Sequence, residues 1–270
     1  MPSPITTQPP FHFHQGTRPL LLSIPHMGTH IPPAIAERLT PEARQVHDTD
    51  WHLDQLYACA VELGASVLQA THSRYVIDLN RPPDNANLYP GQDTTGLCPV
   101  DTFDATPLYL PGQAPTDAEI ATRRDALWQP YHQQLATELA RLQAAHGRVV
   151  LWDAHSIRSV VPRFFEGRLP DFNLGSANDT SCDPALAQRL LAIAQAAPGY
   201  SAVLNGRFKG GYITRQYGQP AQGIHAVQLE QTQSSYMQEQ MPFAYLPEVA
   251  AQVQPHLRAM LAAALAFAQE

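Results

Sequence analysis

The feature that most constrains the fold is a short apolar run, Val149-Val150-Leu151-Trp152, followed directly by Asp153-Ala154-His155. An unbroken run of β-branched and bulky residues is typical of a strand buried on both faces. Strands of this kind belong to open α/β sheets, where ligands bind just beyond the carboxyl ends of the strands. We therefore expect the strand to stop at Asp153 and to present His155 at a functional edge.

A second stretch has the same form. Leu20-Leu21-Leu22-Ser23-Ile24 is followed by Pro25 and His26. Either histidine alone would more often be an ordinary hydrogen-bonded loop residue. Two strands that each deliver one histidine to the same edge of a sheet instead favour a metal site.

Two carboxylates offer a third ligand. Asp48 and Asp50 precede a helical pattern over residues 53–63, and Asp50 is placed to cap its N-terminus. One of the two carboxylates can complete a site with His26 and His155. Two histidines, one carboxylate and a position left for water are the ligands of a catalytic zinc ion, so Zn²⁺ is the expected cofactor.

Further polar groups follow two other predicted strands. Asn80 and Arg81 follow an apolar segment over residues 74–79, and Glu230 ends another over residues 225–230. A carboxylate that does not bind the metal can act as general base. Glu230 is the candidate for this role, and the alternative is that it forms a salt bridge with a local arginine.

Cationic side chains are concentrated in the predicted loops. Arg158 follows His155-Ser156, and the glycine-rich segment 205–215 contains Arg207, Lys209 and Arg215. A guanidinium group matches a carboxylate bidentately. Because the chain as a whole is acidic, this concentration of positive charge indicates a small anionic substrate.

Strands alternate with helices along the 270 residues, without a break in composition that would mark a linker. We expect one α/β domain over residues 1–270, with a mostly parallel or mixed central sheet flanked by helices. Residues 1–16 are predicted to form an N-terminal arm. Residues 84–115 are predicted to form a long loop over the site, because so long a connection is commonly functional.

The composition excludes several classes of partner. A net charge of −7 argues against binding nucleic acid or an anionic membrane, and no apolar run approaches the length of a membrane span. Three widely separated cysteines are poor material for a disulfide framework, which favours a reducing, cytoplasmic location. A homo-oligomer is compatible with the sequence.

Five motifs together resemble the N-formylglutamate amidohydrolase family, and the resemblance runs from about residue 11 to residue 268. They occupy residues 23–28, 48–52, 73–82, 153–158 and 205–215. The resemblance implies hydrolysis of N-formyl-L-glutamate to formate and L-glutamate in bacterial histidine breakdown. It also implies a distant relation to the zinc carboxypeptidases and to their phosphorylase/hydrolase-like fold.

The same resemblance implies roles for individual residues. By similarity to the peptidases, Asn80 and Arg81 clamp the substrate, His155 binds the metal and Glu230 is the base. Arg74 and Tyr212 lie within the shared motifs and join the expected substrate-binding set.

One position departs from the peptidase pattern. There, the first metal histidine is followed three residues later by a glutamate ligand, but Thr29 occupies this position here. The missing carboxylate must come from elsewhere. Asp50 is the first choice because the start of a helix would fix its geometry, and Asp48 is the alternative.

Two other enzymes and one non-enzyme remain open. The enzymes are a deacylase for another N-acyl amino acid and a zinc carboxypeptidase, which needs room for a larger substrate. The non-enzyme is a binding protein for an anionic metabolite that uses the arginines without a metal.

Overall fold

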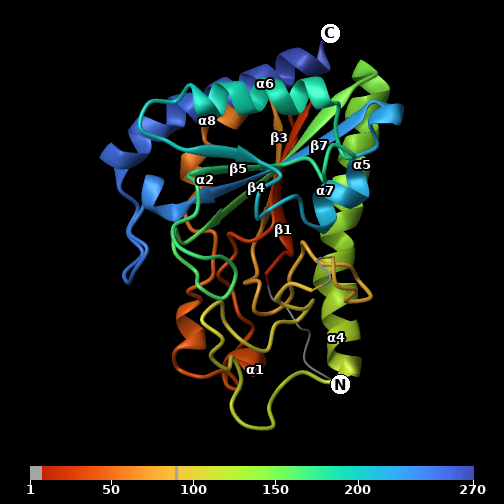
Figure 1. Cartoon of the computed structure of the whole chain (residues 1–270). Coiled ribbons are helices and arrows are strands. Elements are labelled where there is room, and N and C mark those ends of the chain that lie inside the picture. The colour runs from red at the N-terminus through yellow and green to blue at the C-terminus, as the bar shows by residue number, and fades with distance from the viewer. Residues whose placement is uncertain (1–7, 89–90) are drawn as a thin grey trace.

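A seven-stranded mixed sheet forms the centre of the computed structural model, which describes residues 8–88 and 91–270 (Figure 1). The strand order is β1-β3-β2-β4-β7-β5-β6. Strands β3, β2, β4 and β7 are mutually parallel, whereas β1 and β5 pair antiparallel with β3 and β7. The bounds are β1 (Phe11–His14), β2 (Leu20–Ile24), β3 (Ser66–Ala70), β4 (Val149–Ile157), β5 (Phe172–Gly175), β6 (Ala202–Leu204) and β7 (Ile224–Thr232).

Helices cover both faces of the sheet, which confirms the predicted α/β class. In Figure 1, α6 and α8 lie together on one side of the sheet and α5 lies on the other. The α-helices are α1 (Pro33–Ala36), α2 (Leu53–Leu56), α3 (Cys59–Glu62), α4 (Asp117–Arg123), α5 (Gln129–His146), α6 (Pro184–Gln195), α7 (Tyr212–Tyr217) and α8 (Pro247–Ala268). Short 3-10 turns occupy Ala43–Gln45, Pro220–Gln222 and Gln233–Ser235.

The start of α4 and the boundary between α4 and α5 each lie beside a residue that explains them. The Thr116 side chain accepts a hydrogen bond from the backbone N–H of Glu119 and so caps α4. A π-helical turn, Arg124–Trp128, separates α4 from α5. It lies just before Pro130, because proline removes one hydrogen bond of the helical ladder.

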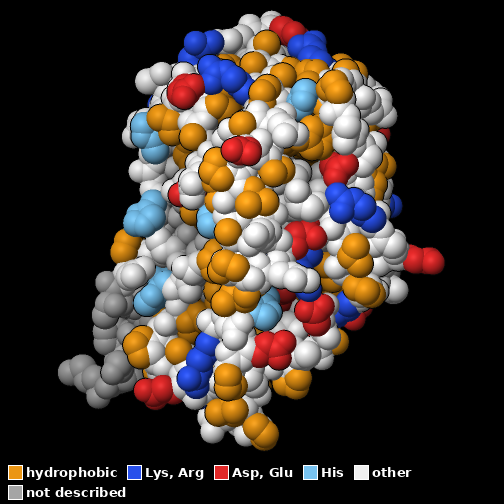
Figure 2. Space-filling model, turned by 90° about the vertical axis from the view of Figure 1, so that its left-hand side faces the viewer, with side chains coloured by type: hydrophobic (Ala, Val, Ile, Leu, Met, Phe, Trp, Pro, Cys, Tyr) orange, Lys and Arg blue, Asp and Glu red, His pale blue; other side chains and the backbone are white. Residues whose placement is uncertain are grey.

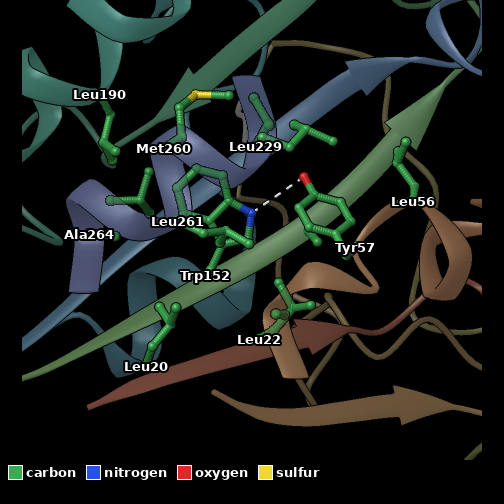
Figure 3. Packing of buried hydrophobic residues seen from close by; sticks show 14 of the residues in the cluster. Leu20, Leu22, Leu56, Tyr57, Trp152, Leu190, Leu229, Met260, Leu261 and Ala264 are labelled. Carbon is green, nitrogen blue, oxygen red and sulfur yellow. Dashed lines mark hydrogen bonds between the residues drawn. The ribbon is translucent and has the colours of Figure 1, made fainter. Parts of the chain in front are cut away.

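Alternate residues of β4 belong to two separate cores. Trp152 and its neighbours on one face pack against α6 and α8, whereas Val149 and Leu151 on the other face pack with α5. Figure 3 shows the first core, where the Trp152 ring lies among Leu20, Leu261 and Met260. Its indole Nε1 donates a hydrogen bond of 3.4 Å to the hydroxyl of Tyr57 (Figure 3). The central strand is thus held on both faces, which fixes the residues at its carboxyl end.

Two strands extend further along the chain than the sequence predicts. β4 continues through His155 to Ile157, and β7 continues past Glu230 to Thr232. The reason is that these strands pair with each other along their whole length, and the ladder continues through the polar residues. His155 and Glu230 are therefore neighbours across two strands rather than residues of loops.

Two further predictions are corrected. Residues 11–14 of the predicted arm form the edge strand β1, while residues 1–7 lie outside the described part of the chain. Residues 74–79 form a buried turn instead of a strand. The sequence gives no clear period for β5, whose four residues form a strand by pairing with β7.

The long segment 84–115 contains no helix or strand within its described residues, 84–88 and 91–115. It is held to the domain by ion pairs, including Arg163 with Asp93 and Arg158 with Asp104. In Figure 1 its yellow trace lies below the sheet.

Charged and apolar side chains are interspersed on the face of the molecule shown in Figure 2, without a single extended basic stripe on that face. None of the helices in residues 8–88 and 91–270 has the length and apolar character required to cross a bilayer.

Candidate metal centre and active site

Three buried side chains converge at the carboxyl end of the central strands. His26 follows β2, His155 lies within β4, and Asp50 comes from the loop before α2. One ligand atom from each lies within 4.8 Å of the other two. The Nδ1 atoms of the two histidines are 3.1 Å apart, and Asp50 Oδ2 is 3.2 Å from His155 Nδ1 and 3.7 Å from His26 Nδ1.

A second set of carboxylates orients the two imidazole rings. Asp78 Oδ1 lies 2.7 Å from His26 Nε2, and Asp153 Oδ2 lies 3.2 Å from His155 Nε2. Partners of this kind fix the ring orientation of metal-binding histidines and increase their basicity. With their Nε2 atoms engaged, both rings turn Nδ1 toward Asp50.

The three residues fit a divalent cation. Two imidazole nitrogens at 3.1 Å repel each other through their lone pairs unless a proton or a cation lies between them. Asp50 Oδ1 is buried and has no hydrogen-bond partner within residues 8–88 and 91–270, so it is also available to a cation. Two nitrogens and a carboxylate oxygen match the preferences of zinc.

The electrostatics of the centre agree with this fit. Burial alone would lower the pKa of His155, but Asp153 and Asp50 raise this pKa well above its ordinary value. The centre therefore attracts positive charge strongly enough to hold a proton when no cation is bound. Metal and proton compete for the same nitrogen.

Asp50 reaches the centre from a loop and does not cap a helix, contrary to the sequence prediction. α2 begins at Leu53 after His52, whose φ of 60° is left-handed. The backbone N–H of Asp50 donates to the carbonyl of His26, and its Oδ2 accepts a hydrogen bond of 3.1 Å from the backbone N–H of Ser156. These bonds tie the carboxylate to the ends of β2 and β4.

Asp48, the alternative carboxylate, lies apart from the two histidines. Its Oδ2 accepts hydrogen bonds from the hydroxyl of Tyr75 and the backbone N–H of Phe103. Its Oδ1 lies 3.8 Å from Arg158. The structure thus brings Asp50, and not Asp48, together with His26 and His155.

A cavity of about 60 Å³ opens beside the cluster and is lined by His26, His155 and Glu230. Glu230 pairs in register with His155 across β4 and β7. Burial raises the pKa of Glu230 to about 8; the neighbouring His155 acts against this shift, and Asp50 adds to it. A bound dication lowers such a pKa again, since it stabilises the carboxylate.

Three of the predicted cationic residues line the cavity, namely Arg74, Arg81 and Arg207. Arg74 pairs with Asp78 at 2.7 Å, and its Nη1 lies 3.8 Å from Asp50. The guanidinium of Arg81 donates to the carbonyl and hydroxyl of Thr95. Three guanidinium groups thus line the cavity, and the long segment 84–115 adds Asp93, Thr94 and Phe103 to its lining.

The other four predicted substrate-binding residues do not line this cavity. Arg158 is engaged by both carboxylate oxygens of Asp104 at 2.9 Å. Tyr212 and Arg215 line a separate surface hollow beside α7, and Lys209 lines neither. The glycine-rich segment 205–215 therefore contributes Arg207 as its cation to the cavity.

Asn80 lines the cavity, but its side-chain amide is bonded within the protein. Sequence reasoning missed Asp78 and Asp153, whose carboxylates accept hydrogen bonds from Asn80, and Gln228, which lines the cavity. For Asp153 the signal was present, since it lies two residues before His155 on β4. In an extended strand such spacing places both side chains on one face.

The comparisons with known proteins agree with this arrangement. A model of the N-formylglutamate amidohydrolase family matches residues 18–237. The N-formylglutamate deformylase of Pseudomonas aeruginosa is 55% identical over 258 residues, which cover 96% of this chain and 97% of that protein. The N-formylglutamate deformylase of Pseudomonas putida is 53% identical, with 96% of each chain covered.

Solved structures show the same similarity. The N-formylglutamate amidohydrolase from Ralstonia eutropha JMP134 superposes with a TM-score of 0.80 at 26% identity, covering 96% of this chain and 97% of that chain. A protein from Agrobacterium tumefaciens shares the fold, with a TM-score of 0.73 at 22% identity and 97% of each chain covered. The resemblance inferred from the five motifs is confirmed, and the chain belongs to the N-formylglutamate amidohydrolase family.

Proposed function

We propose that this protein hydrolyses N-formyl-L-glutamate to formate and L-glutamate. The observation that carries the proposal is the buried cluster of His26, Asp50 and His155 at the floor of a cavity lined by arginines. The two curated relatives described above bear the name of this activity. The reaction would belong to the breakdown of histidine, and a cytoplasmic location remains a prediction.

The activity is proposed to depend on a divalent metal, with Zn²⁺ as the first candidate. His26, Asp50 and His155 would hold the ion through two nitrogens and one carboxylate oxygen. When bound, such an ion polarises a carbonyl group and makes water a stronger nucleophile near neutral pH. Asp78 and Asp153 keep the two imidazoles in place for it.

Glu230 is the proposed general base. It faces the same cavity as the metal cluster but is not part of it. It accepts a proton from the attacking water and passes that proton to the amide nitrogen, so that glutamate leaves with a neutral amine. Arg74, between Asp50 and the cavity, is placed to stabilise the negative charge that develops on the formyl oxygen.

Two substrate carboxylates require two cationic partners. Arg81 and Arg207 line the cavity and are proposed for this role. Arg158, Lys209, Tyr212 and Arg215, which were predicted from the sequence, lie outside the lining and are not proposed for direct contact with this substrate.

A substrate panel tests the proposal. We expect formate release from N-formyl-L-glutamate, and a specificity constant at least about tenfold lower for N-formyl-L-glutamine, because a charge-assisted hydrogen bond contributes roughly 1.5–3 kcal/mol. Long N-acyl glutamates should be poor substrates, since the cavity is small. Equal rates for the acid and the amide would refute the second carboxylate contact, and efficient cleavage of long acyl chains would favour the alternative deacylase.

The non-enzymatic alternative makes a different prediction. A binding protein for an anionic metabolite would bind N-formyl-L-glutamate without releasing formate, with or without added zinc. A peptidase would cleave C-terminal peptide bonds faster than it removes a formyl group. That the protein has no nucleic-acid or membrane partner remains a prediction. A homo-oligomer remains compatible with the sequence.

A further inference from the structure

Gln228 lines the cavity, and among the described residues its side chain is hydrogen-bonded through its oxygen only. The residue is 3% exposed and lines the cavity. Its Oε1 accepts a hydrogen bond of 2.7 Å from the backbone N–H of Gly211. Within residues 8–88 and 91–270, its Nε2 donates to no protein atom. Gln228 Nε2 is not among the buried side-chain atoms that lack a partner in this part of the chain, so it is open to the cavity, where an oxygen of a ligand can accept from it.

The contact with Gly211 fixes the orientation of the amide. In an amide side chain only the oxygen is an acceptor, so Gln228 keeps Oε1 toward the Gly211 N–H and directs Nε2 elsewhere. Gly211 also has no room for a side chain, since an added Cβ would lie 2.4 Å from Asn80 Nδ2. The three residues are therefore packed against one another, and Gln228 cannot easily turn over.

Asn80 differs from Gln228 because both ends of its amide are occupied. Its Oδ1 accepts from the backbone N–H of Ile213 at 2.8 Å. Its Nδ2 lies 2.9 Å from His155 Nε2 and 3.3 Å from Asp153 Oδ2. Asn80 is thus a positioning residue for His155, and the amide with unused N–H groups at this cavity is Gln228.

The position of Gln228 indicates which part of the substrate it meets. Gln228 and Glu230 are two residues apart on β7, so their side chains lie on one face of the strand. Glu230 must lie near the nitrogen of the scissile amide in order to protonate it. The α-carboxylate is attached to the carbon that bears this nitrogen, which makes it the nearest anionic group to Gln228.

We propose that Gln228 binds the α-carboxylate of the substrate through its Nε2 and so determines specificity for N-acyl α-amino acids. This assignment rests on the proposed function and adds a neutral donor to the arginines. A hydrogen bond to a charged group is stronger than one between neutral groups. The contact forms when the substrate binds and does not change during the reaction, so it lowers KM and leaves kcat nearly unchanged.

The substitution Gln228→Met tests the proposal, because methionine has a similar length but offers no donor. We expect KM for N-formyl-L-glutamate to rise roughly ten- to hundredfold, with kcat within about threefold of wild type and metal content unchanged. Gln228→Glu keeps an acceptor for Gly211 but replaces the donor, and should raise KM at least as much. The matched control is Gln216→Met, at an exposed position of α7 outside the cavity.

A second substrate identifies the group that is recognised. N-formyl-4-aminobutanoate lacks only the α-carboxylate, so wild type and Gln228→Met should show the same KM for it. A KM for N-formyl-L-glutamate like that of wild type in both Gln228 variants, or an equal penalty on the two substrates, would overturn the assignment. If wild type itself releases no formate, the proposed function is contradicted and the assignment fails with it.

Discussion

Replacing His155 by alanine is expected to abolish both metal retention and hydrolysis of N-formyl-L-glutamate. His155 offers Nδ1 to the cluster, and its ring is held by Asp153 within a fully buried strand. Loss of one ligand would remove the proposed ion, and such an ion contributes several kcal/mol to stabilisation of the transition state. We therefore expect the rate to fall by at least about 10³-fold, since each 1.4 kcal/mol is a factor of ten.

Metal analysis of the purified variant, together with formate release, measures both effects. His12→Ala is the matched control, because it removes an exposed imidazole from the edge strand β1. Circular dichroism should show that both variants are folded. Full metal occupancy in the His155→Ala variant would exclude His155 as a ligand.

Replacing Glu230 by glutamine is expected to leave the metal bound and to reduce kcat by ~10²–10⁴. The substitution preserves the size of the side chain and removes only the oxygen that accepts the proton. Glu230 lines the cavity without belonging to the metal cluster, so metal content should stay at the wild-type level. This combination distinguishes a base from a ligand.

Pre-steady-state and steady-state rates of formate release provide the measurement. Glu62→Gln, at an exposed ion pair with Arg258, makes the same chemical change far from the cavity. Turnover close to wild type in the Glu230→Gln variant would show that another group acts as the base. Loss of the metal in that variant would instead place Glu230 among the ligands.

The main architecture could be predicted from the sequence because the central strands are buried on both faces. β2 and β4 read as unbroken apolar runs, and each has a core on either side. The starts of α4 and α6 also carry local signals, Thr116 as the N-cap of α4 and Pro184 as the first residue of α6. Local signals of this kind depend on neighbours along the chain, which a sequence shows directly.

The edges of the sheet and the ends of the strands could not be predicted in the same way. β1 and β5 are four residues each and become strands only by pairing with β3 and β7. His155 lies inside β4 because β7 extends the ladder past it. Tertiary pairing overrides local propensity in such places.

The sequence predicts that the residues of the candidate site gather at the ends of neighbouring strands. It does not predict which side chain each arginine contacts. Arg158 follows His155 closely in sequence, yet its guanidinium is bound by Asp104, which is 54 residues away. Asp78 was hidden within a segment read as a strand, although it holds both His26 and Arg74. Contacts of long side chains depend on the distant segments that the fold brings beside them.

The most direct test of the account is a zinc titration of the metal-depleted protein, followed by formate release from N-formyl-L-glutamate. The cluster of His26, Asp50 and His155 predicts no activity before zinc is added. The rate should then rise linearly and reach its maximum at one zinc ion per chain. Full activity of the depleted protein, unchanged by zinc or by other divalent metals, would contradict the account.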